Sequence, residues 1–233
     1  MELSLRYGVR LTLLLGLASC TAGESQRTES PKHGIGNPLI SGGCEAPASA
    51  NHGKFGCYFD ESIILEAPPR ELFYHVDEFE DRASAERART PGSVVVDAYG
   101  RLFLETVSGD ASWRPPSARR IATVGPMPAP ASSRVTARFM QAMTRPGAKT
   151  RPHSHDGPEA FHIFSGAICM ETPDGAETTV AGQDYWIRGD VPMQLSSTGT
   201  EVRRSLFVVL HPSSRPWMNI SIPWTPSGRC QTA

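Results

Sequence analysis

The sequence has almost no excess of charge of either sign. Lys and Arg total 23 of its 233 residues and Asp and Glu total 24, which gives a formal net charge of -1. Proteins dedicated to nucleic acids carry a basic excess, because they must neutralise phosphates. The balance therefore argues against a nucleic acid as the partner of this chain.

The signatures of several enzyme classes are also missing. The sequence contains no G-x-S-x-G nucleophile elbow, no Walker A phosphate loop and no Rossmann glycine fingerprint. These absences disfavour α/β-hydrolases, P-loop kinases and nicotinamide dehydrogenases. The chain also lacks a C-x-x-C pair, which disfavours thioredoxin-like redox chemistry.

Long apolar runs are absent, and the one short run lies near the start of the chain. Residues 11–17 follow Arg6 and Arg10 and are mostly apolar, but a bilayer-spanning helix needs about 20 such residues. This layout predicts a secretory signal peptide over residues 1–19. The run ends at Leu17-Ala18-Ser19-Cys20, which resembles a bacterial lipobox and implies Cys20 as the lipidated first residue of the mature protein. The alternative is a buried N-terminal helix that ends in a Cys by chance.

The lipobox resemblance also implies a location. In the Gram-negative lipoproteins that this segment resembles, Thr21 in place of Asp favours the outer membrane. We therefore expect a protein of the bacterial cell envelope that is lipid-anchored to the membrane and faces the periplasm. Such an anchor holds well, because each buried methylene of an acyl chain contributes about 0.8 kcal/mol.

Four cysteines remain besides Cys20, and an exported compartment permits disulfides. Four cysteines allow three full pairings, among which the sequence cannot choose. Cys44 and Cys57 are the most plausible pair, because they bracket a short loop rich in small residues. Cys169 lies in an apolar strand pattern and is expected to be a buried free thiol, which leaves Cys230 in the tail.

Turn-forming residues are abundant, with 21 Gly and 20 Pro, and favour short strands over long helices. Residues 20–54 lack periodicity and are predicted to be a flexible tether, and residues 224–233 a tail. Residues 134–223 are predicted to form an all-β sandwich or barrel. Residues 55–133 are predicted to form a β-rich N-terminal flank. The flank contains one helix candidate, residues 83–90 after an N-cap at Asp81, and strand-like runs at residues 71–79, 93–99, 101–107 and 119–127.

One constellation indicates chemistry. His153 and His155 alternate with Ser154, so both imidazoles point to the same face of an extended strand. Residues 156–158 are Asp-Gly-Pro, a turn signal, after which Glu159 begins the next strand beside the two histidines. Two imidazoles and one carboxylate form the facial triad of a divalent-metal site with open positions. Fe, Mn, Ni, Cu and Zn all suit this ligand set.

These residues match a known motif. The first cupin motif is G-x5-H-x-H-x3-E-x6-G, and the chain agrees with it at every defined position from Gly147 to Gly166. Residues 134–223 thus resemble the cupin superfamily, and the whole layout is similar to that of cupin-domain bacterial lipoproteins. The resemblance implies a cupin-type double-stranded β-helix, or jelly roll, that binds a small polar molecule. By resemblance alone it also implies a homodimer.

The second cupin motif is only partly present. It normally supplies a fourth ligand, a His, and here Met193 or Gln194 occupies that place. Methionine is a weak ligand for hard divalent ions, and Gln194 offers at most an amide oxygen. We therefore expect either a three-residue metal site completed by water or a site that has lost its metal.

Other residues are expected to have structural roles. His162 should turn to the face opposite Glu159 and pack, and His211 should close a barrel rim. Phe161 and Ile163 share the parity of Glu159 and should line the interior. Two pairs stay open, because strand alternation allows one member of each to face the pocket: Tyr185 or Trp186, and Arg203 or Arg204.

Two functions from different classes are compatible with the sequence. The first is a metal-dependent cupin enzyme, an oxidoreductase or isomerase, with the metal held by His153, His155 and Glu159. The complete first motif supports it. The second is a non-catalytic, metal-free ligand-binding or scaffolding lipoprotein. The absent fourth ligand and the membrane tether support that alternative.

Overall fold

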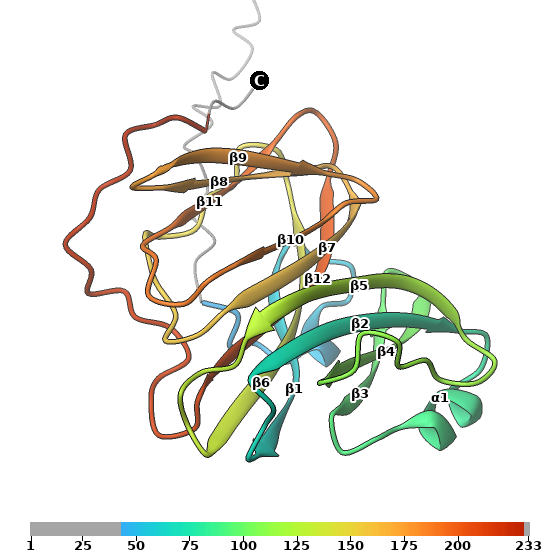
Figure 1. Ribbon diagram of the computed structural model, residues 1–233. Coiled ribbons are helices and arrows are strands. Elements are labelled where there is room, and N and C mark those ends of the chain that lie inside the picture. Colours follow the sequence, from blue (N-terminus) through green and yellow to red (C-terminus); the bar gives the residue numbers. More distant parts are fainter. Residues whose placement is uncertain (1–42, 231–233) are drawn as a thin grey trace, which may run out of the picture. The chain divides into compact units, whose positions relative to one another are not determined.

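The computed structural model describes residues 43–230, and strands dominate it (Figure 1). The predicted all-β class with one short α-helix is confirmed. The predictions for residues 1–19, Cys20 and the first part of the tether lie outside the described residues. The elements are η1 Ala48–Ala50, β1 Gly56–Glu66, β2 Glu71–Phe79, α1 Arg82–Ala88, β3 Ser93–Ala98, β4 Arg101–Ser108, β5 Arg119–Pro128, β6 Arg134–Thr144, β7 Glu159–Ser165, β8 Ala167–Thr172, β9 Gly175–Val180, β10 Asp184–Ile187, β11 Gln194–Thr198 and β12 Arg203–Pro212.

The strands form three sheets in which hydrogen-bonded neighbours are antiparallel. Their orders are β1-β6-β12-β7-β10, β11-β8-β9 and β3-β4-β2-β5. The five-stranded sheet is the middle layer, because one hydrophobic cluster joins it to the four-stranded sheet and a second joins it to the three-stranded sheet. Among the described residues, no helix is long and apolar enough to cross a membrane.

Strand β12 shows how the sequence builds the middle layer. Leu206, Val208 and Leu210 belong to the cluster that faces the four-stranded sheet. Phe207 and Val209 belong to the cluster on the opposite face. A strand that is buried on both faces reads as a continuous apolar run, which explains the run SLFVVL in this segment.

The five- and three-stranded sheets enclose the second cluster between them, which is the arrangement of a jelly roll. Phe161 and Ile163 lie in this cluster, at 1% and 0% exposure, as their parity predicted. The cluster also contains Met193 and Leu195 from the segment around β11. The interior beside Glu159 is thus a packed core whose outer end is open to ligands.

The flank is a single sheet and not a second pair of facing sheets. Strands β2 to β5 form it, and α1 packs against it. Strand β1, which falls within the region predicted as flank, pairs instead with β6 through a register that runs from Gly56–Met143 to Glu66–Arg134. Pairing between strands about 80 residues apart leaves no local signal in the sequence.

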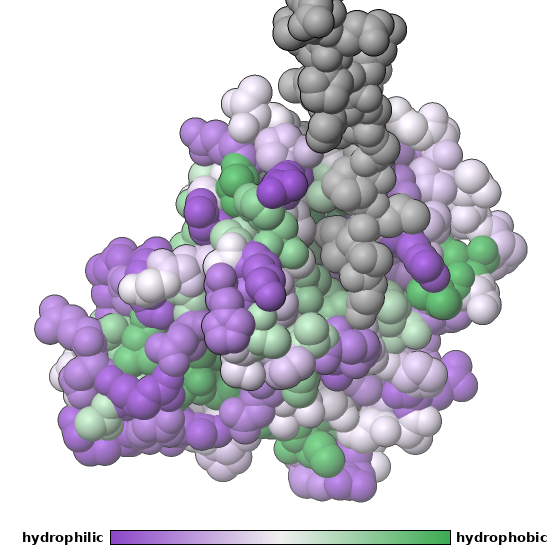
Figure 2. All heavy atoms as spheres, turned by 180° about the vertical axis from the view of Figure 1, so that it is seen from behind, coloured by the Kyte–Doolittle hydropathy of each residue, from purple (hydrophilic) through white to green (hydrophobic). Residues whose placement is uncertain are grey.

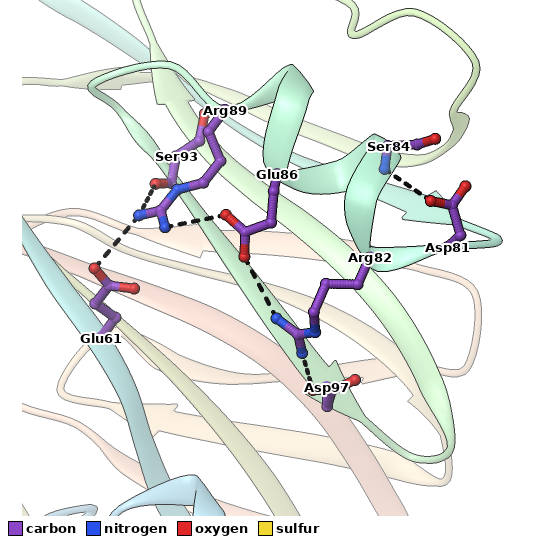
Figure 3. A network of polar contacts seen from close by, with 8 residues as sticks. All are labelled: Glu61, Asp81, Arg82, Ser84, Glu86, Arg89, Ser93 and Asp97. Atoms are coloured by element: carbon purple, nitrogen blue, oxygen red, sulfur yellow. Dashed lines mark hydrogen bonds and ion pairs between the residues drawn. The ribbon is translucent and has the colours of Figure 1, made fainter.

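Helix α1 begins as predicted. The Asp81 side chain accepts a hydrogen bond from the backbone N–H of Ser84 at 2.8 Å, which satisfies a donor at the helix start. Exposed ion pairs then connect the two ends of the helix to neighbouring strands, namely Arg82 with Asp97 of β3 and Arg89 with Glu61 of β1 (Figure 3). Exposed ion pairs of this kind contribute little to the free energy of unfolding, so their main effect is on the orientation of the helix.

A group of carboxyls lies between the flank and the five-stranded sheet. Asp60 of β1 accepts a hydrogen bond from the Gln141 amide at 2.7 Å, and Glu105 of β4 accepts one from the Tyr74 hydroxyl. Each carboxyl has a second oxygen that is buried without a partner. Burial raises the pKa of Asp60 to about 7 and raises that of Glu105 well above its usual range.

Two disulfides are present, and one of them corrects an expectation. The predicted pair Cys44–Cys57 is confirmed. The expected free thiol at Cys169 is wrong, because Cys169 is bonded to Cys230 with 5.6 Å between their Cα atoms. The apolar pattern correctly indicated a buried residue, 4% exposed, but its partner arrives from a segment 61 residues later.

Residues 213–230, which we call the C-terminal strap, run back over the jelly roll without regular structure. Near its end, the strap donates backbone N–H groups of Ser227, Gly228 and Arg229 to the Glu171 carboxylate. Near its middle, Asn219 pairs with Ser154 through two backbone hydrogen bonds of 2.8 and 2.9 Å. These contacts and the Cys169–Cys230 disulfide fix both parts of the strap.

The surface is mixed in character. Figure 2 shows hydrophobic side chains in separate patches among hydrophilic ones. The large hydrophobic side chains exposed among the described residues come from four separate segments, at Phe55, Ile64, Val180 and Ile220. The homodimer remains a prediction.

Candidate functional site

The structure brings the three predicted ligand residues together. One potential ligand atom from each of His153, His155 and Glu159 lies within 4.8 Å of the other two. The side chains come from the segment before β7 and from its first residue, and they are 4%, 1% and 2% exposed. Such a group of buried nitrogen and oxygen donors is a candidate metal centre.

Backbone pairing on both sides of the segment orients the histidines. His153 and Met193 exchange backbone hydrogen bonds of 2.9 and 2.8 Å, and Ser154 pairs with Asn219 of the strap. The segment is therefore extended, and the side chains of His153 and His155 point to the same side, as their spacing predicted. Their ring centroids are 5.0 Å apart.

The turn between His155 and Glu159 depends on glycine. A Cβ at Gly157 would lie 2.1 Å from the backbone oxygen of Leu210, and a Cβ at Gly189 would lie 2.6 Å from the Cα of Gly157. Both distances are far inside van der Waals contact, so only glycines allow these backbones to meet. This close packing places Glu159 beside the histidines.

Hydrogen bonds determine which nitrogen of each imidazole carries the proton. Nδ1 of His153 lies 2.8 Å from the backbone oxygen of Arg151, and Nδ1 of His155 lies 2.6 Å from that of Trp217. A carbonyl can only accept, so both Nδ1 atoms carry a proton, and in this neutral tautomer of each ring Nε2 presents its lone pair. Burial, followed by the neighbouring His155, lowers the pKa of His153 and favours its neutral form.

Two atoms of the cluster have no partner within residues 43–230. Nε2 of His155 and Oε2 of Glu159 are buried there without a hydrogen bond, although they lie only 3.3 Å apart. With the Nδ1 proton assigned, a nitrogen lone pair faces a carboxylate oxygen, and such an arrangement is unfavourable unless a cation or proton lies between them. A divalent ion fits this donor set.

The cluster lies in the wall of a cavity of about 310 Å³, within the size range of small-molecule sites. Phe161 and Phe207 contribute aromatic surface from the five-stranded sheet, and Leu195 contributes from β11. The strap adds Trp217, Met218 and Ile220 to the lining. Trp217 stacks on His155 with 5.6 Å between the ring centroids, so the strap touches the cluster directly.

Arg203, and not Arg204, faces this cavity. Arg203 is the first residue of β12 and is 4% exposed, and its Nε donates to Thr144 Oγ1 at 3.0 Å. Burial lowers the pKa of its guanidinium to about 10, against the opposing effects of Tyr99 and Glu159. The group therefore remains charged at neutral pH.

The candidates for a fourth ligand lie elsewhere. Met193 sits directly across from His153 and is 1% exposed, but it packs in the hydrophobic cluster and does not line the cavity. The Gln194 amide donates to the backbone oxygen of Thr150 at 3.0 Å and does not line the cavity either. The described cluster therefore offers three protein ligands.

The remaining candidates behave as structural residues. His162 is 5% exposed and bonds Asp184 Oδ1 at 2.7 Å, away from the cluster. His211 is 7% exposed and lies 3.0 Å from the backbone oxygen of Pro212. Tyr185 and Trp186 line a different depression and not the cavity beside Glu159.

Sequence reasoning missed the contribution of the strap. Trp217 and its neighbours fall in a segment with no periodicity, so only the cluster of Trp217, Met218 and Ile220 in an otherwise polar stretch could have signalled a buried role. Arg203 was identified as one of two alternatives. Strand parity alone could not decide between them, because the sequence does not show which face of β12 lines the cavity. Arg203 shares the parity of Phe207, which lines it.

No protein-family model matches the chain, and no curated protein matches it. Several solved structures align with it. A cupin-like protein of Thermotoga maritima is 17% identical over 40% of this chain and 66% of that one, with a TM-score of 0.34. An RmlC-like cupin of Methanocaldococcus jannaschii is 12% identical over 31% of this chain and 67% of that one, with a TM-score of 0.30. A cupin domain of Bordetella pertussis is 19% identical over 31% of this chain and 78% of that one, with a TM-score of 0.28.

The facing antiparallel sheets of the described residues form a jelly roll, and the residues from Gly147 to Gly166 match the first cupin motif. The His-His-Glu group lies within this motif. The four-stranded flank packs against the five-stranded sheet, and the strap pairs with the segment that carries the histidines.

Proposed function

We propose that this cupin holds a divalent metal ion through His153, His155 and Glu159 and binds a small molecule beside it. The observation that carries the proposal is the pair of buried, unpartnered atoms, Nε2 of His155 and Oε2 of Glu159, which face each other at the cavity wall. Cupins are a fold on which many activities occur, so the site and not the fold must support the function.

The chain's own residues define what the site can do. The hydrogen bonds from both Nδ1 atoms to backbone carbonyls hold the imidazoles in place. Histidines that bind a metal through one ring nitrogen commonly donate the N–H of the other nitrogen in this way. The strap covers one side of the cavity and limits the access of water. A bound divalent metal would supply Lewis acidity to a coordinated ligand. Oxidation or isomerisation of a small polar compound is the reaction class that fits, with Fe, Mn, Ni, Cu or Zn as the ion.

We also propose that the protein is exported and anchored to the cell envelope through Cys20, in the outer membrane facing the periplasm. The layout of residues 1–20 supports this proposal. Two disulfides within the described residues are a second support, because disulfides persist in oxidising compartments such as the periplasm.

Elemental analysis of the full chain, purified in detergent, tests the metal proposal. We expect about one transition-metal ion per chain, because three protein ligands and open positions define one site. Replacement of His153 and His155 by Ala should remove the metal. The matched control is His162→Ala, which removes an equally buried histidine outside the cluster and should retain it.

The opposite results would contradict the proposal. Protein without metal, or a double variant with undiminished metal, would show that the three residues do not form a metal site. The metal-free ligand-binding protein would then be the better description of this cupin.

A further inference from the structure

A buried guanidinium in the cavity has unused hydrogen-bonding capacity. Only Nε of Arg203 has a partner, the Thr144 hydroxyl at 3.0 Å. Among residues 43–230, its Nη1 and Nη2 atoms have no hydrogen-bond partner and no carboxylate within ion-pair distance. Four N–H donors of a charged group therefore remain available on the cavity side.

The orientation of this guanidinium is fixed. Thr144 Oγ1, which accepts from Nε, also lies 2.6 Å from the hydroxyl of Ser197. Thr144, Ser197 and Arg203 are all buried, at 2%, 2% and 4% exposure. An arginine held by Nε presents its two terminal nitrogens as a planar fork, the geometry that matches a carboxylate with two parallel hydrogen bonds.

The charge of the cavity also favours an anion. Glu159 is the one carboxylate among the described residues that line the cavity, and it lies beyond ion-pair distance of Arg203. Arg151 adds a second cationic side chain to the same lining. A buried cation without a close partner is costly, and that cost is removed when an anionic ligand binds. A divalent ion at the cluster would add further positive charge to the same cavity.

The rest of the cavity selects the body of the ligand. Its walls include Phe161, Phe207, Leu195 and Trp217, which offer apolar and aromatic surface. A volume of about 310 Å³ lies at the small end of ligand sites. A compact molecule with one apolar ring or branched chain fits this description.

We propose that Arg203 binds the carboxylate of a small organic acid whose apolar body lies against Phe161, Phe207 and Trp217, beside the metal cluster. This inference deepens the proposed function, because it names the ligand class of the same site. It does not depend on an occupied metal site, since the guanidinium fork is a feature of the protein alone.

Calorimetric titration of the full chain with benzoate and with benzamide tests the proposal. The two probes have the same ring and similar size, but only benzoate carries the anionic group. We expect benzoate to bind at least about tenfold more tightly than benzamide, because hydrogen bonds to charged groups contribute about 1.5–3 kcal/mol. Absence of benzoate binding, or equal affinity for both probes, would overturn the proposal without the need for a variant.

Variants assign the effect to Arg203. Arg203→Lys keeps the charge but removes the fork and should weaken benzoate binding by about tenfold, and Arg203→Met should abolish it. Arg204→Lys is the matched control, because Arg204 is the next residue on the same strand and does not line the cavity. Thermal unfolding verifies that each variant is folded, and if Arg203→Met fails to fold, the Lys variant decides. Unchanged benzoate affinity in Arg203→Lys would contradict the proposal.

Metal content, measured on the same samples, separates this inference from the proposed function. Arg203-dependent benzoate binding by metal-free protein would support the inference and contradict the metal site. If every Arg203 variant keeps its metal and binds benzoate as tightly as the wild-type protein, the result would support the metal site and contradict the inference.

Discussion

Replacement of Cys169 and Cys230 by Ala is expected to lower the free energy of unfolding by about 4 kcal/mol. The two cysteines are 61 residues apart, and a cross-link that closes a loop of this length removes much of the entropy of the unfolded chain. Urea denaturation of the oxidised protein and of the double variant measures the difference.

The Cys44–Cys57 pair provides the control for this prediction. Its cysteines are only 13 residues apart, so the same model expects a smaller loss of about 3 kcal/mol for the corresponding double variant. A smaller effect at Cys169–Cys230 than at Cys44–Cys57 would mean that the strap contributes little to the folded state.

The Asp60 carboxyl is expected to contribute a loss of stability as the pH rises from about 4 to 7, and Asp60→Asn should remove that contribution. At low pH the Asp60 carboxyl is protonated in the folded and the unfolded chain. As the pH rises, the unfolded carboxyl ionises near pH 4, whereas burial keeps the folded one protonated up to a pKa of about 7. The unfolded state is thereby favoured by on the order of 4 kcal/mol above neutral pH.

Urea denaturation at pH 5 and pH 8 checks this prediction. Asp60→Asn retains an oxygen that can accept from Gln141 but cannot ionise, so the variant should be the more stable protein at pH 8. Glu61→Gln is the control, because Glu61 is the next residue on β1 and is exposed. A wild-type protein and an Asp60→Asn variant with the same pH dependence would show that the Asp60 carboxyl is not desolvated as described.

The local parts of the site were predictable because they follow from short-range geometry. The spacing of His153, His155 and Glu159 determines which way each side chain points on an extended chain that turns once. Asp81 as an N-cap and Cys44–Cys57 as a pair rest on equally short distances along the sequence. In each case the interacting residues are separated by a few residues, or by a loop so short that its two ends must lie close together.

The parts that could not be predicted depend on long-range contacts. The pairing of β1 with β6, the Cys169–Cys230 bond and the strap's Trp217 all join segments that are tens of residues apart. Their registers result from packing of the whole molecule, which no periodicity records. The assignment of Arg203 to the cavity falls between the two cases. Strand alternation reduced the choice to two residues, and the packing of the sheets determined which face of β12 lines the cavity.

The position of the strap has a consequence for biosynthesis. The ribosome makes His153, His155 and Glu159 well before it makes Trp217, whose carbonyl oxygen orients His155 and whose ring walls the cavity. Cys230, which secures the strap, follows Trp217 in the chain and is bonded to Cys169. A nascent chain therefore has its ligand residues while its pocket is still open, and the pocket is completed only when the strap has been made and the Cys169–Cys230 bond has formed.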